Sequence, residues 1–284
     1  MSAPQEAGVE GALATGAVLF ALGLVAVPFA GELLRRLPRR VPVFFARWGF
    51  SHVLLVGLSS VAAGFVFGPA IHALFAKPVA EGEPEVGVVG ALWLTMAMLG
   101  TGVLGALTLA RRLQPEGLAA LGICRRGNPR GMLAGGLAYV LVLPGVVGVS
   151  VLWPVIAGAL GFTVEPQEVL VGIEQLSGIG LWQAVVLAVF AGPFLEETLF
   201  RGFLQPLLVQ NLSERGGVAA TSALFAAMHG VSAFGPLFAL SLLLGYVQLR
   251  THRLAAAWFV HGLHNAVTLA IVLLLPDWYA SLNP

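Results

Sequence analysis

The chain has 284 residues, of which 58% are hydrophobic and only 10% charged, and its formal net charge is +1. Soluble domains carry about 25% charged residues, so this composition excludes an ordinary water-soluble globule. A net charge near zero supplies no basic field for nucleic acid, which we therefore exclude as a partner. The single cysteine, Cys124, cannot form an internal disulfide or a cysteine-rich metal site.

Long apolar segments make up most of the chain. A membrane-spanning helix needs about 20 predominantly apolar residues, and eight segments approach this length. The first lacks the basic residues that precede the apolar part of a secretory signal, so we expect it to be retained. The sixth and seventh are short, are separated only by the turn 232–236, and alternatively form a re-entrant pair. The predicted spans are 11–31, 50–75, 88–110, 132–160, 181–208, 217–232, 234–249 and 254–276.

These segments predict an all-α, polytopic integral membrane protein with about eight transmembrane helices. We find no hydrophilic domain, long-period repeat or low-complexity tract, so residues 1–284 are expected to form a single membrane domain. Its partners therefore include the lipid bilayer. Richness in Ala, Gly, Val and Leu is typical of a GC-rich bacterial genome, and we expect the protein in the bacterial cytoplasmic membrane.

Basic and acidic residues alternate between successive loops. The positive-inside rule places Lys and Arg in cytoplasmic loops, and this alternation predicts that both termini face outward. The basic loops follow the first, third, fifth and seventh predicted spans and carry Arg35, Arg36, Arg39, Arg40 and Arg47, then Arg111, Arg112, Arg125, Arg126 and Arg130, then Arg215, then Arg250 and Arg253. The acidic loops carry Glu81, Glu83 and Glu85, then Glu165, Glu168 and Glu174, with Lys77 as their only base.

Ionisable residues inside membrane spans are costly and mark candidate functional sites. Glu196 and Glu197 are adjacent in the fifth predicted span, three residues after Pro193. Arg201 follows Glu197 at i,i+4, so the two share a helix face and are expected to pair. Glu196 lies about 100° further round the helix, away from that arginine. Burial without a partner would raise the pKa of Glu196, which suits a general base.

Further polar groups fall in the sixth and eighth predicted spans. His229 follows Phe225 at i,i+4, and Asn265 follows His261 at the same spacing. At a rise of about 1.5 Å per residue, both histidines and Asn265 reach depths that overlap that of Glu196. Each group alone is consistent with structural packing, but their common depth favours one site. His264 lies about 60° off the face of His261.

The three motifs Glu-Glu-x-x-x-Arg, Phe-x-x-x-His and His-x-x-x-Asn, in this order on successive helices, resemble the signature of the CAAX protease and bacteriocin-processing enzyme (CPBP) family, also called Abi. The resemblance covers 181–276, which it makes the catalytic core, whereas 1–180 are variable N-terminal spans. It implies a glutamic-type intramembrane endopeptidase without a cofactor. Glu196 and His229 would then activate water, His261 and Asn265 would bind the oxyanion, and Glu197, Arg201 and Phe225 would support them.

The residue types agree with peptide hydrolysis, which needs a base, a proton donor and oxyanion donors. The substrate would be a protein or peptide with a membrane-embedded or lipid-linked segment: a prenylated tail, a bacteriocin leader or a C-terminal sorting signal. Two alternatives stay open. Glu196, His229, His261 and His264 suit a zinc site, although the sequence lacks His-Glu-x-x-His. A transporter or another non-catalytic membrane protein could instead use Glu196 and His229 as a proton relay.

Overall fold

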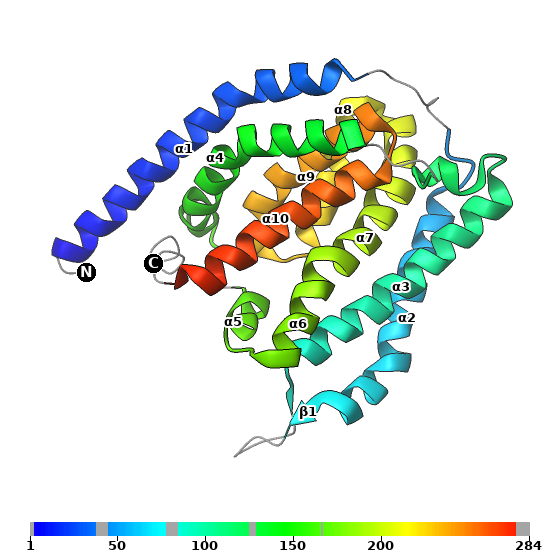
Figure 1. Ribbon diagram of the computed structural model, residues 1–284, viewed down its shortest axis with the longest axis horizontal. Coiled ribbons are helices and arrows are strands. Elements are labelled where there is room, and N and C mark those ends of the chain that lie inside the picture. The colour runs from blue at the N-terminus through cyan, green and yellow to red at the C-terminus, as the bar shows by residue number, and fades with distance from the viewer. Residues whose placement is uncertain (1–2, 38–44, 78–84, 125–128, 166, 277–284) are drawn as a thin grey trace.

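The computed structural model of the protein describes residues 3–37, 45–77, 85–124, 129–165 and 167–276. Its regular elements are helices apart from one small antiparallel ribbon (Figure 1). The long helices are α1 (Ala3–Arg35), α2 (Phe50–Phe75), α3 (Val88–Leu113), α4 (Pro129–Ala159), α8 (Gln205–Ala227), α9 (Val231–Thr251) and α10 (Leu254–Leu274). The short elements are β1 (Ala76–Lys77), β2 (Glu85–Val86), η1 (Gly117–Leu121), α5 (Glu168–Glu174), α6 (Gly178–Val186), η2 (Leu187–Ala191), α7 (Gly192–Glu197) and η3 (Thr198–Leu204).

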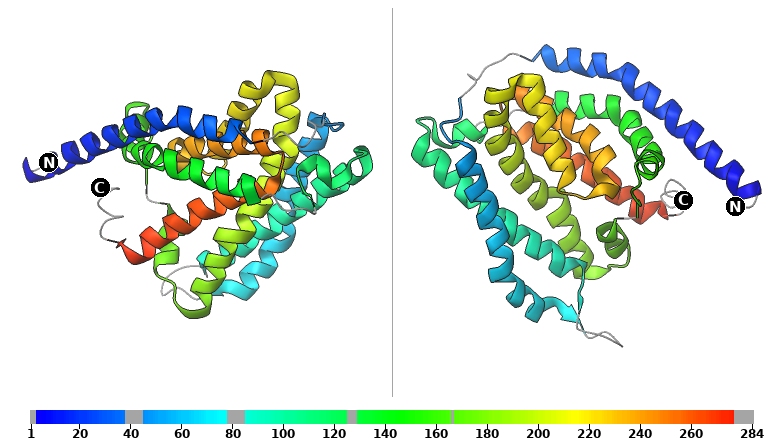
Figure 2. Two further views of the ribbon diagram at one scale, coloured as in Figure 1. Left: turned by 45° about the horizontal axis from the view of Figure 1, so that its top comes forward. Right: turned by 180° about the vertical axis from the view of Figure 1, so that it is seen from behind.

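Seven helical stretches are long and apolar enough to cross a membrane, and one of them, Gly178–Ala227, runs over 50 residues. The chain reverses within this stretch at Ser213, where φ is 78° and ψ is 167°. In Figure 2 the yellow segment doubles back on itself. The two arms touch closely, since a Cβ at Gly217 would clash with the backbone nitrogen of Val209. Counting the arms separately confirms the prediction of about eight helices.

The turn after α8 lies earlier than the sequence predicts. We expected it at 232–236, but α8 ends at Ala227, α9 begins at Val231, and Pro236 lies inside α9. Gly230 explains the difference because its φ of 81° ends the helix, and such a value is strained for residues with a side chain. Residues 214–227 rise about 21 Å, less than the roughly 30 Å of bilayer hydrocarbon. This arm therefore ends within the thickness of the bundle.

The helices form two outer pairs around an inner group. In Figures 1 and 2, α1 runs along α4 on one side, α2 runs along α3 on the other, and α7 to α10 lie between them. Glycines allow the first pair to approach closely: a Cβ at Gly23 would clash with the Cα of Gly145. Small residues commonly take this role between membrane helices, where packing replaces the hydrophobic effect.

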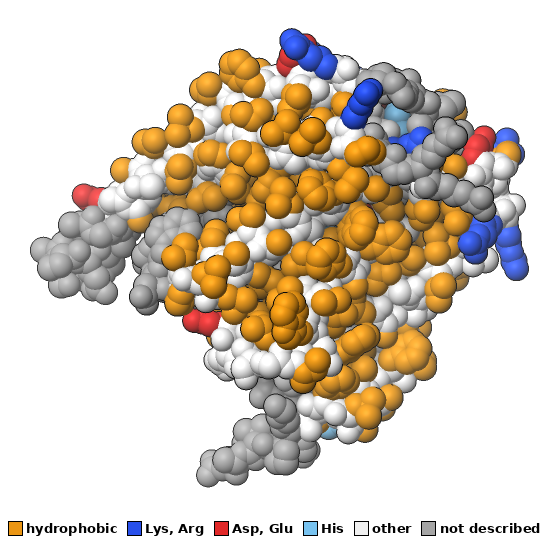
Figure 3. Space-filling view, viewed as in Figure 1, with side chains coloured by type: hydrophobic (Ala, Val, Ile, Leu, Met, Phe, Trp, Pro, Cys, Tyr) orange, Lys and Arg blue, Asp and Glu red, His pale blue; other side chains and the backbone are white. Residues whose placement is uncertain are grey.

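The outer surface has the character of a protein in lipid. Large apolar side chains such as Phe65, Leu74 and Ile179 are exposed on the bundle, and Figure 3 shows a broad apolar face with Lys and Arg at its upper and right margins. The basic loops meet at one end, because Arg250 of α9 donates hydrogen bonds to the backbone oxygens of Leu34 and Arg35 in α1. The sequence-predicted loop charges at Arg39, Arg40, Arg125, Arg126, Glu81 and Glu83 lie outside the described residues.

The close approach of α1 and α4 makes a testable prediction. Gly23→Ala should destabilise the protein by about 1 to 3 kcal/mol, because the added methyl meets backbone that cannot turn away. Gly31→Ala makes the same chemical change in α1 where no atom lies within 4 Å. Thermal unfolding in detergent should therefore show a lower Tm for Gly23→Ala alone. Equal melting of the two variants would contradict the packing of α1 on α4.

Candidate active site

Two π-helical turns flank the paired glutamates. The helix containing Glu196 and Glu197 widens before them in η2 and after them in η3. In η2 the backbone N–H of Gly192 bonds the carbonyl of Leu187, five residues back, and Pro193 follows with no N–H to donate. The sequence indicated an interruption at Pro193 but not the π-turns. Single π-turns of this kind are frequent at functional sites.

Glu197 and Arg201 form the ion pair that their spacing predicts. Arg201 Nη1 donates to Glu197 Oε1 over 3.0 Å, and both side chains have zero exposure. Arg201 Nη2 donates to Ser241 Oγ of α9 over 2.6 Å. The guanidinium carbon also lies 4.5 Å from the ring centroid of Phe225 in α8, a cation–π distance. The pair thus joins η3 to α8 and α9 while keeping the charge of Glu197 compensated.

His261 of α10 lies between the two glutamates. Its Nδ1 lies 2.9 Å from Glu197 Oε1, and its Nε2 lies 3.7 Å from Glu196 Oε2. A carboxylate only accepts, so the proton on Nδ1 faces Glu197 and leaves Nε2 directed toward Glu196. The Glu196 side chain retains 18% exposure, whereas that of Glu197 has none. The two adjacent acids therefore occupy different environments, as their positions around the helix predict.

Carbonyl groups of η2 anchor α10. Asn265 Nδ2 donates to the oxygen of Ala188 over 2.7 Å, and Trp258 Nε1 donates to the oxygen of Phe190 over 2.9 Å. Between these anchors, a Cβ at Gly262 would lie 2.6 Å from the oxygen of Val189. Gly262 therefore lets the two backbones meet. Asn265 has two N–H groups, and only one is used in this anchor.

His229 lies in the turn after α8 rather than inside a span. Its Nδ1 lies 2.8 Å from the oxygen of Phe225. A carbonyl can only accept, so Nδ1 carries the proton and the neutral ring has its lone pair on Nε2. The Phe225 ring centroid lies 4.6 Å from that of His229 and 5.7 Å from that of His261. The Phe225 ring therefore packs against both imidazoles.

One cavity of about 570 Å³ brings the predicted residues together. All four residues expected to be catalytic line it: Glu196, His229, His261 and Asn265. The supporting residues Glu197, Arg201 and Phe225 lie behind this wall and are buried. Thr95 and Met96 of α3 also line the cavity, so the third predicted span contributes to it as well.

His264, which lies about 60° off the face of His261, also lines the cavity. Its Nδ1 lies 3.1 Å from the hydroxyl of Tyr139 in α4. Even so, no three His, Cys, Asp or Glu side chains in the described part of the chain are arranged to hold a metal ion.

Several partners of the site were not identified from the sequence. Ser241, Tyr139 and Trp258 belong to other helices and carry no motif, so only the fold brings them to Arg201, His264 and η2. Gly262 lies inside the His-x-x-x-Asn motif. A glycine inside a helical pattern is a signal of close backbone approach.

One known protein family matches the part of the chain that contains the candidate site. Residues 178–267 match the family described as Rce1-like, Type II CAAX prenyl endopeptidase, which confirms the resemblance drawn from the three motifs. This match indicates a peptidase. The long apolar helices indicate an integral membrane protein. No curated protein and no solved structure matches the chain.

The buried ion pair leads to a prediction about folding. Arg201→Ala should cost about 3 to 5 kcal/mol because it leaves Glu197 as an uncompensated buried charge. The exposed Arg112→Ala is the control. Yield of folded protein and Tm in detergent should fall for Arg201→Ala only. If Arg201→Ala has the same Tm as the wild type, the ion pair does not stabilise the fold as described.

Proposed function

We propose that the protein is an intramembrane endopeptidase of glutamic type, in which Glu196 activates the attacking water. The observation that carries this proposal is the unequal environment of the two glutamates. Glu197 is neutralised by Arg201 and held by His261, whereas Glu196 forms no ion pair with an arginine of the described residues and faces the cavity. A carboxylate that is free to accept a proton, next to space for a substrate, is what a general base requires.

In the proposed reaction, the Glu196 carboxylate takes a proton from water as the water oxygen bonds to the scissile carbonyl carbon. The lone pair on His229 Nε2 orients the same water. The carbonyl π-bond then becomes a tetrahedral oxyanion. When the C–N bond breaks, its electron pair stays on nitrogen, and the Glu196 carboxyl returns the proton to that leaving amine. Glu196 ends ionised, so atoms and charge balance over the cycle.

Two donors are available for the oxyanion. Asn265 has the second N–H of its amide, since the first is bonded to Ala188. In the protonated ring, His261 Nε2 is a donor while Nδ1 stays bonded to the carboxylate of Glu197. Donors fixed before the reaction begins stabilise the charge that develops in the transition state. The anchor of Asn265 and the ion pair of Glu197 thus serve to hold these donors in place.

The first prediction of this proposal concerns Glu196. Glu196→Gln keeps the size of the side chain and removes the base, so cleavage should fall by about 10²-fold or more with Tm unchanged. Glu174→Gln, an exposed acid outside the cavity, should cleave normally. Because the natural substrate is unidentified, the assay incubates purified enzyme with solubilised membranes of the expression host and counts new peptide termini by mass spectrometry. Wild-type cleavage by Glu196→Gln would refute the mechanism.

A second prediction separates the oxyanion role of Asn265 from its role as an anchor. Asn265→Ala removes both the anchor to η2 and the free N–H, whereas Trp258→Phe removes only an anchor to η2. Both variants should lower Tm slightly, but only Asn265→Ala should lose about 10² to 10³ in turnover. An equal loss of turnover in the two variants would contradict the oxyanion role and show that Asn265 acts only by anchoring α10 to η2.

The third prediction concerns metal. The proposed mechanism uses no ion, so cleavage should survive exhaustive chelation and the protein should bind no stoichiometric zinc. Elemental analysis of the purified protein and the cleavage assay, each before and after chelation, provide the measurement. Activity that is lost on chelation and returns only with zinc would support the metalloenzyme alternative.

A further inference from the structure

The cavity at Glu196 extends toward one end of the bundle. Glu165, Gln167 and Glu168, which lie before and at the start of α5, are exposed and line the same cavity as Glu196. The residues of α3 that line this cavity lie near the beginning of that helix. The residues of α10 that line it extend to Leu269, near the end of that helix. The mouth of the cavity is therefore at the end of the bundle where α3 begins and α10 ends.

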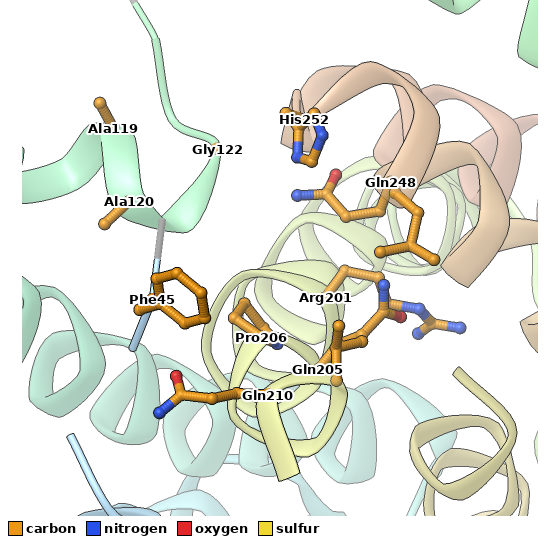
Figure 4. Close-up of a pocket in the computed structure, with 12 residues that line it drawn as sticks. Phe45, Ala119, Ala120, Gly122, Arg201, Gln205, Pro206, Gln210, Gln248 and His252 are labelled. Atoms are coloured by element: carbon orange, nitrogen blue, oxygen red, sulfur yellow. The ribbon is translucent and has the colours of Figure 1, made fainter. Parts of the chain in front are cut away.

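The opposite direction is closed by the ion pair. Glu197, Thr198 and Arg201 follow Glu196 in the helix and have zero exposure. Beyond them lies a separate cavity of about 200 Å³, lined by Arg201, Gln205, Gln248 and others (Figure 4). Its lining shares no residue with the cavity at Glu196. Among the described residues, then, the ion pair forms a floor between the two cavities.

The closed end is the arginine-rich end. The small cavity is lined by His252, which precedes Arg253, and by Ala119 and Ala120 of η1, which follows α3. The described arginines at this end include Arg35, Arg111, Arg112, Arg130 and Arg250 at the ends of α1, α3, α4 and α9. No Lys or Arg of the described residues lines the cavity at Glu196.

Membrane proteins retain their arginine-rich loops in the cytoplasm. From this rule and the position of the mouth, we infer that the active-site cavity opens to the extracytoplasmic side and takes an exported protein or peptide, not a cytoplasmic lipidated tail. This inference rests on the proposed peptidase function. The charged side chains at the described part of the mouth, Glu165 and Glu168, are acidic, so a neutral or basic segment enters at lower electrostatic cost than an acidic one.

The orientation is tested by thiol labelling, which needs no catalysis. Cys124→Ser removes the only native thiol, and single cysteines are then introduced at the mouth (Gln167→Cys) and at the opposite end (Arg112→Cys). A membrane-impermeant maleimide added to intact spheroplasts should label Gln167→Cys, and it should label Arg112→Cys only after permeabilisation. Labelling of Arg112→Cys in intact spheroplasts, with Gln167→Cys protected, would overturn the inference.

The substrate side is tested through the cavity wall. Thr95→Cys places a thiol in the cavity, and an impermeant methanethiosulfonate reagent is added from outside to spheroplasts that contain this variant. The reagent should abolish the cleavage that depends on Glu196. Without the reagent, the sites of that cleavage should lie in extracytoplasmic segments. Sites confined to cytoplasmic segments would refute the inference while leaving the peptidase intact. Absence of any Glu196-dependent cleavage would refute the proposed function instead, whatever the labelling shows.

Discussion

The buried pair of Glu197 and Arg201 is the constraint on which the arrangement of the site depends. A charge without a partner in a bilayer or a protein interior is very costly, so each member requires the other. The pair also contacts Ser241 and the ring of Phe225, and Glu197 holds His261. Three helices are thereby fixed relative to η3. Because Glu197 is committed to this network, its neighbour Glu196 is the acid that faces the cavity.

The π-turns provide a second constraint of the same physical kind. Backbone carbonyls inside a membrane protein must be bonded within the protein, since lipid offers no donor. The widened turn η2 presents the oxygens of Ala188 and Phe190, and these are bonded by Asn265 and Trp258 of α10. Backbone irregularity beside the glutamates thus becomes the docking surface for the helix that carries His261.

The network also divides the interior into two compartments. Above the pair lies the large cavity with Glu196, His229 and His261, and below it lies the small one with Gln205 and Gln248. In this arrangement one structural interaction has two consequences: it holds the groups proposed to act on the peptide bond, and it closes the path toward the arginine-rich end. The chemistry and the direction of access therefore follow from the same ion pair.

The sequence by itself predicted the membrane class, about eight helices and the polar residues that line one cavity, because apolar length and i,i+4 spacing are local properties. Spacing separated the roles of Glu196 and Glu197 before any tertiary contact was known. Tertiary structure alone decided the π-turns, the turn at Gly230 and the partnership of Ser241, Tyr139 and Trp258. These features depend on which distant helices meet and on which buried polar groups then need partners, and neither is encoded in the periodicity of a single segment.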